Sequence, residues 1–166
     1  MIKTIFRVAI LALLALNLNA ASLLVKTDFS GTWTLDKAKS EGLPPSMEQT
    51  VTVTQKDDKI TVETKSVTDK GEQTSSDSYT VDGKETEYTP KVPNNVTNAK
   101  AKRSVKWTTD GFEVLETITG DTPTGAVTVV TMRKWSLSAD GKTLKIDLTQ
   151  KLPDGTREIK RTFTKK

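Results

Sequence analysis

Arginine, glutamate and tryptophan are the residues of this chain whose types and spacing could form a binding site. Arg133, Arg157 and Arg161 occupy positions that otherwise carry apolar residues in the alternating segments near the C-terminus, and Glu116 occupies such a position in an earlier segment. A guanidinium suits a carboxylate because its planar N–H groups can donate two parallel hydrogen bonds. The pattern therefore favours a cationic interior that holds the acidic head of an amphipathic small molecule.

Each of these side chains also has a structural interpretation. Arg133 could form an ion pair with Glu116, because a buried charge requires a partner. Arg161 could close one end of the fold over an aromatic ring, and we favour this role for it. Tryptophan side chains could line a pocket or fill the core. The candidate ligand-binding residues are Arg133, Trp107, Trp135, Glu116 and Arg157.

Composition excludes several kinds of catalytic and metal site. The 166 residues contain no cysteine and no histidine, which thiolate nucleophiles, histidine acid–base catalysis and the usual zinc sites require. The sequence also lacks a glycine-rich phosphate loop and a G-x-S-x-G motif. Glu85 and Glu87 share a strand face, where solvated charges are the simpler interpretation. We therefore expect no enzymatic activity, no metal and no cofactor.

Alternation of apolar and polar residues with a period of two predicts β-strands from about residue 48 onward. Val51 and Val53 alternate with threonines, and Leu144, Ile146 and Leu148 alternate with polar residues. No stretch of ten or more residues after the N-terminal segment has a helical period. Up to ten strands are expected, near residues 31–36, 48–56, 59–68, 73–81, 84–89, 100–109, 112–119, 126–138, 142–151 and 156–164.

Short turn signals, including Asp82-Gly83, separate the predicted strands. Two-residue loops centred on 57–58, 110–111, 140–141 and 154–155 place apolar residues opposite each other: Val53 and Val62, Trp107 and Val114, Trp135 and Ile146, Ile146 and Phe163. In this register both Arg133 and Arg161 lie opposite Leu148. The longer connections 37–47, 90–99 and 120–125 fall at the end away from the termini, which is the expected mouth.

This pattern predicts an all-β fold, a single antiparallel up-and-down β-barrel of eight to ten strands. An even number of strands lets the first and last strands pair, which closes a barrel and removes exposed sheet edges. The outward positions are mainly Thr, Lys, Glu and Ser, so we expect no insertion of this barrel into a membrane. The expected assembly is a monomer.

The N-terminal segment has the layout of a secretory signal peptide. Lys3 and Arg7 precede an apolar stretch from Val8 to Leu16, and small residues follow from Ala20. We predict a signal peptide over residues 1–21 and export to the periplasm or the extracellular space. Removing this segment leaves 23 Lys and Arg against 21 Asp and Glu, a net charge of +2. This near balance argues against a nucleic-acid-binding protein.

Gly31, Thr32 and Trp33, at the start of the first predicted strand, resemble the Gly-x-Trp signature of lipocalins and the wider calycin group. The longer runs 29–40 and 134–144 look like a group of exported, poorly characterised bacterial lipocalin-like domains. The resemblance implies a lipocalin-like β-barrel over residues 28–165. It also implies that Gly31, Trp33 and Arg161 close the base of the barrel, with the arginine over the indole.

Two functions follow as expectations. The first is an exported, soluble protein that binds a small hydrophobic or amphipathic ligand, such as a carboxylate, inside the barrel. The alternative is a protein-interaction, inhibitor or envelope-stress domain with a filled core and no ligand. Its contact surface would be the loops at the mouth, above all Glu41–Met47, which contains Leu43, Pro44 and Pro45.

Overall fold

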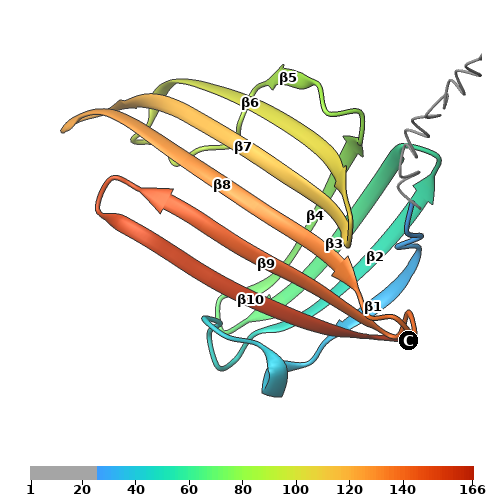
Figure 1. Ribbon diagram of the computed structural model, residues 1–166. Coiled ribbons are helices and arrows are strands. Elements are labelled where there is room, and N and C mark those ends of the chain that lie inside the picture. Colours follow the sequence, from blue (N-terminus) through green and yellow to red (C-terminus); the bar gives the residue numbers. More distant parts are fainter. Residues whose placement is uncertain (1–25) are drawn as a thin grey trace, which may run out of the picture.

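The computed structural model describes residues 26–166, which form ten antiparallel β-strands in one sheet (Figure 1). The strands are β1 (Gly31–Leu35), β2 (Glu48–Lys56), β3 (Lys59–Thr68), β4 (Gly71–Thr80), β5 (Glu85–Tyr88), β6 (Thr97–Thr108), β7 (Gly111–Thr122), β8 (Gly125–Leu137), β9 (Thr143–Leu152) and β10 (Gly155–Lys165). The helical content of these residues is one 3-10 turn, η1 (Lys37–Lys39). The predicted all-β class is therefore confirmed. The signal peptide predicted for residues 1–21 lies outside the described residues.

The strand order is β4-β3-β2-β1-β10-β9-β8-β7-β6-β5, so the first and last strands pair as expected. Within residues 26–166, every pair of consecutive strands is joined by a ladder except β4 and β5. The turn expected at Asp82-Gly83 does separate two strands, but these strands do not pair as an up-and-down order requires. The backbone N–H of Val81 donates to Asp58 O (2.8 Å) and that of Gly83 to Val105 O (2.8 Å). These bonds attach the segment between β4 and β5 to the β2–β3 turn and to β6, and a seam without a ladder is left between β4 and β5.

The end of the barrel opposite the described start and the C-terminus is formed by five connections. The longest are 36–47 and 89–96, in agreement with two of the three long connections expected there. The third, 120–125, is instead a tight turn, because Thr122 pairs directly with Gly125. In this part of the chain, no helix is long and apolar enough to cross a membrane.

The predicted register is confirmed in two hairpins and shifted in two others. Val53 pairs with Val62 and Trp135 with Ile146, as expected. Trp107 pairs with Phe112 rather than Val114, and Arg161 pairs with Ile146, so Arg161 does not lie opposite Leu148. Each shift is two residues. Because side chains alternate with a period of two, every side chain keeps its face while its neighbours change.

Aromatic side chains fill the base half of the barrel around Phe112. Its ring centroid lies 5.2 Å from Trp135 in a stacked arrangement and 5.0 Å from Phe29 in an edge arrangement. Trp107 and Tyr79 lie at 6.1 and 6.4 Å. Such pairs add roughly 0.5–1.5 kcal/mol each to the area that the rings bury. The base is therefore a packed core.

Trp33 lies in this base and is fully buried, and its Nε1 donates to Phe29 O at 3.0 Å. The cation over its indole is Lys165, whose Nζ lies 5.1 Å from the ring centroid. The structure thus gives Lys165 the place expected for Arg161. Gly31 (φ +143°) makes room for it, because a Cβ there would lie 2.8 Å from Lys165 Cε.

Glycines at the starts of strands explain the shifted hairpins. Gly111 and Gly155 are the first residues of β7 and β10, so the turns comprise the two residues before them. Gly111 has φ +158°, and a Cβ built on it would lie 1.9 Å from Trp135 O and 2.9 Å from Phe29 Cζ. Gly111 therefore permits the close approach of β7 to β8.

We expect Gly111→Ala to lower the free energy of unfolding by about 3 kcal/mol or more, because the methyl group meets backbone. The matched control is Gly71→Ala, which starts β4 with φ +107° and has no atom within 4 Å of its added Cβ. The control should cost only about 1 kcal/mol of backbone strain. Urea unfolding measures both, and equal losses would contradict the assignment.

Candidate functional site

A cavity of about 300 Å³ lies inside the barrel between β2–β4 and β8–β10. Its apolar wall includes Val51, Val62 and Ile146. Two inward-facing arginines, Arg133 on β8 and Arg161 on β10, line the same cavity. The remaining lining residues are Met47, Gln49, Thr64, Ser66, Ser75, Asp77, Tyr79 and Trp135. The interior is thus filled at the base and hollow nearer the mouth.

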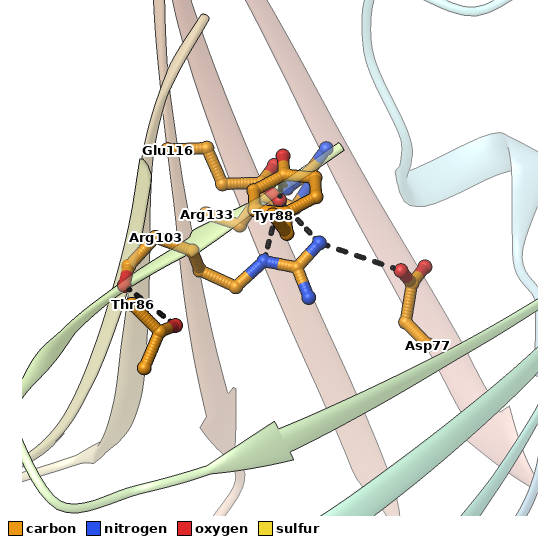
Figure 2. Close-up of polar contacts among 6 residues, drawn as sticks. All are labelled: Asp77, Thr86, Tyr88, Arg103, Glu116 and Arg133. Carbon is orange, nitrogen blue, oxygen red and sulfur yellow. Dashed lines mark hydrogen bonds and ion pairs between the residues drawn. The ribbon is translucent and has the colours of Figure 1, made fainter. Parts of the chain in front are cut away.

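Glu116 on β7 is the most buried charge beside this cavity, with 5% of its surface exposed. Arg133 Nη1 contacts its Oε2. Arg103 Nε donates a hydrogen bond to its Oε1 at 2.7 Å, and Arg103 Nη2 forms an ion pair with the same oxygen at 2.6 Å (Figure 2). The Tyr88 hydroxyl donates to the same Oε1 at 3.1 Å. Both carboxylate oxygens of Glu116 are therefore occupied by donors.

Burial by itself would raise the pKa of Glu116. The charges of Arg133 and Arg103 and the hydrogen bonds that they donate outweigh this effect and lower the pKa below its usual value. Glu116 is consequently an anion at neutral pH, and Arg133 and Arg103 share its single negative charge.

Arg103, on β6, extends across the seam between β4 and β5 (Figure 2). Its Nη2 lies 3.5 Å from Asp77 Oδ1 on β4, and its guanidinium lies 5.0 Å from the Tyr79 ring and 4.5 Å from the Tyr88 ring. Its backbone oxygen accepts a hydrogen bond from Thr86 Oγ1 on β5 (3.3 Å). Side-chain contacts therefore connect the two strands that share no ladder.

Arg103 is not among the site residues predicted from the sequence. It lies between Ala101 and Val105 on the inward face of β6, directly opposite Glu116 in the β6–β7 ladder. Ala101 and Val105 alternate with polar residues, which indicates that Arg103 faces inward. The correct register of the β6–β7 hairpin would then have placed Arg103 opposite Glu116. The shifted register assumed for this hairpin placed a different residue opposite Glu116.

Arg161 contrasts with the other two arginines. Among the described residues it forms no ion pair, and its Nε is buried without a hydrogen-bond partner. Trp135 Nε1 is also buried and unpaired. Trp135, Ile146 and Arg161 form one row across β8, β9 and β10, so the two unpaired donors are about two strand spacings, or ~10 Å, apart at the backbone.

Burial lowers the pKa of Arg161, and the charges of Arg133 and Arg157 lower it further. Each of these effects disfavours its cationic form. An arginine nevertheless stays protonated in proteins. The cavity wall therefore contains a partly desolvated positive charge that has no counterion among the described residues, and an anionic group could stabilise it.

The structure brings together three of the five predicted ligand-binding residues. Arg133 and Trp135 line the cavity. Glu116 does not line it but contacts Arg133. Trp107 lies at the base, where its Nε1 donates to Asp58 Oδ1 (2.9 Å). Arg157 is exposed near the β9–β10 turn. Neither residue lines the cavity, and no group of three or more potential metal ligands occurs within residues 26–166.

No protein-family model and no curated protein matches the chain. Among solved structures, zebrafish ileal bile acid-binding protein in complex with cholic acid is 18% identical, with a TM-score of 0.50 over 83% of this chain and 98% of that one. The fatty-acid-binding protein of Manduca sexta is 16% identical (TM-score 0.41; 82% and 99% covered). Secretory abundant heat soluble protein 4 of Ramazzottius varieornatus is 15% identical (TM-score 0.43; 83% and 94% covered). The zebrafish match shows that this chain shares the antiparallel β-barrel fold of that protein.

We expect Glu116→Gln to lower the free energy of unfolding at pH 7 by about 3 kcal/mol, because the half-buried Arg133 loses its counterion and Arg103 keeps only Asp77, at 3.5 Å. The pKa of Glu116 is lower in the folded state. Its stabilising effect is therefore present above the unfolded pKa, near 4.5, and is lost as the pH falls below it. The difference between wild type and variant should shrink between pH 5 and pH 3.

Urea unfolding at pH 7 and pH 3 measures this difference. The control is Glu72→Gln on β4, which removes an exposed ion pair with Lys65 (2.8 Å) and should cost less than about 1 kcal/mol. A deficit in Glu116→Gln that stays constant down to pH 3 would argue against the ionised cluster.

Proposed function

We propose that this protein binds a small amphipathic carboxylate inside the barrel. The observation that carries the proposal is the cavity of about 300 Å³ with the unpaired guanidinium of Arg161 in its wall. The volume lies at the lower end of the range for small-molecule pockets. The combination of apolar surface and one uncompensated cation matches a ligand with an apolar body and an acidic head.

In this proposal Arg161 binds the carboxylate. A charge-assisted hydrogen bond is roughly twice as strong as a neutral one, and the low dielectric of the interior strengthens it further. Trp135 Nε1 offers a second donor from the same row of residues. The apolar body of the ligand packs against Val51, Val62 and Ile146. No covalent step is part of this function, which is that of a binding protein.

Ligand binding is preferred to the interaction function because the interior is hollow near the mouth. The loop Glu41–Met47, the expected contact surface of the interaction function, is attached to the barrel. Glu41 and Lys160 exchange two backbone hydrogen bonds, of 2.8 and 3.1 Å. Met47 lines the cavity. We propose that this loop forms the rim of the pocket.

We also propose that the protein works outside the cytoplasm. The features that support this are sequence features: the basic residues Lys3 and Arg7, the apolar stretch Val8–Leu16 and the small residues after it. Native mass spectrometry of the protein purified from the exported fraction of its host would test both ideas. We expect a mass excess that corresponds to an organic acid. A clean polypeptide mass without uptake from a host lipid extract would contradict ligand binding.

Arg161→Gln should weaken binding of a medium-chain carboxylate such as octanoate about 10- to 100-fold, because one charge-assisted contact is lost. The matched control is Arg157→Gln. Arg157 lies on the same strand, four residues before Arg161 and on the same face, but its side chain is exposed. This control should change the affinity less than about threefold, because water screens its charge. Isothermal titration calorimetry measures both, and equal affinities for the wild type and Arg161→Gln would rule out the proposed head-group contact.

A further inference from the structure

The arginines around the cavity carry more positive charge than the neighbouring carboxylates neutralise. This excess charge bears on the charge of the ligand. Three guanidiniums lie in or beside the cavity, those of Arg103, Arg133 and Arg161. Two carboxylates face them, those of Glu116 and Asp77. Within residues 26–166 this cluster therefore has one net positive charge. The geometry assigns this charge to Arg161, because the other two guanidiniums contact Glu116.

Arg133 lines the same cavity as Arg161 and would be the obvious second ligand for a doubly charged head group. Its Nη1 is instead engaged with Glu116 Oε2, and Glu116 Oε1 is occupied by Arg103 and Tyr88. A dianion at Arg161 would therefore add a negative charge that no unpaired cation of the cavity wall balances, because Arg157 is exposed and does not line the cavity. Arg133 is the cation of the cavity wall that could balance this charge, and Glu116 already neutralises it.

We infer that Glu116 determines the charge of the ligand: by engaging Arg133 and Arg103 it leaves Arg161 free and restricts the pocket to head groups with a single negative charge. Carboxylates and sulfonates fit this requirement, whereas the dianion of a phosphate monoester does not. Glu116 does not line the cavity and acts through Arg133, so it is a positioning residue. This inference rests on the proposed ligand site.

One ligand provides an internal test. Octyl phosphate changes from a monoanion to a dianion near pH 6, while octanoate is mainly a monoanion from pH 5.5 to pH 8. The chain contains no histidine and no cysteine, so none of its side chains has an ordinary pKa in this interval. From pH 5.5 to pH 8, we expect the affinity for octyl phosphate to fall about tenfold or more, while that for octanoate changes less than about threefold.

Glu116→Gln should release Arg133 and reverse this preference, so that octyl phosphate at pH 8 gains about tenfold relative to octanoate. The double variant Glu116→Gln with Arg133→Gln removes one charge of each sign and should restore the wild-type preference. Circular dichroism verifies that each variant is folded. The wild-type pH experiment tests the inference even where a variant does not fold.

The outcomes separate the two proposals. If neither octanoate nor octyl phosphate binds at either pH, the proposed function fails and the inference fails with it. If octanoate binds at Arg161 but octyl phosphate binds equally well at pH 5.5 and pH 8, the ligand site stands and the role of Glu116 is wrong. An unchanged preference in folded Glu116→Gln would likewise overturn that role.

Discussion

The carboxylate of Glu116 is the contact on which both the closure of the barrel and the charge of its cavity depend. It lies on β7 and accepts hydrogen bonds or ion-pair contacts from Tyr88 on β5, Arg103 on β6 and Arg133 on β8. Arg103 continues the network to Asp77 on β4. Four strands are thereby connected to β7 by side chains. The network spans the region where β4 and β5 lack a backbone ladder, so electrostatic contacts replace the hydrogen bonds missing from the sheet.

Such a cluster is a costly way to close a barrel. Burying Glu116 and, in part, Arg103 and Arg133 disfavours folding. A well-packed apolar set of similar volume is often at least as stable. A structural role alone would not require Arg133 and Arg161 to share a cavity wall. The cluster together with the unpaired Nε of Arg161 defines the charge of the cavity. Arg133 is neutralised by Glu116 and Arg161 is not, so the pocket carries a defined positive charge. A purely apolar interior could not have such a charge.

The interior is divided into two halves with different physical roles. The base is occupied by large aromatic rings that exclude water. The centroids of neighbouring rings lie 5.0 to 6.1 Å apart. The half nearer the mouth carries polar and charged side chains. They occupy the inward positions of the same strands two to four residues further from the base. Arg133 and Trp135 on β8 illustrate the change, because they are inward neighbours and both line the boundary of the cavity. The packed base holds the strands in register, and this register places the arginines.

The sequence by itself determined the strand positions and the face of each side chain. These properties are local: a period of two depends only on neighbouring residues, and a register error of two residues leaves every face unchanged. The inward positions of Arg133, Arg161 and Glu116 were therefore predictable. The ion pair of Arg133 with Glu116 was one of the two interpretations that the sequence offered, and the structure contains it. The pairing of Arg103 with Glu116 was not predictable, because the β6–β7 hairpin is shifted by two residues from the expected register. Only the tertiary structure decided the seam between β4 and β5, the pairing of Arg103 with Glu116 and the hollow beside Arg161, because each depends on the exact register of strands that are distant in sequence.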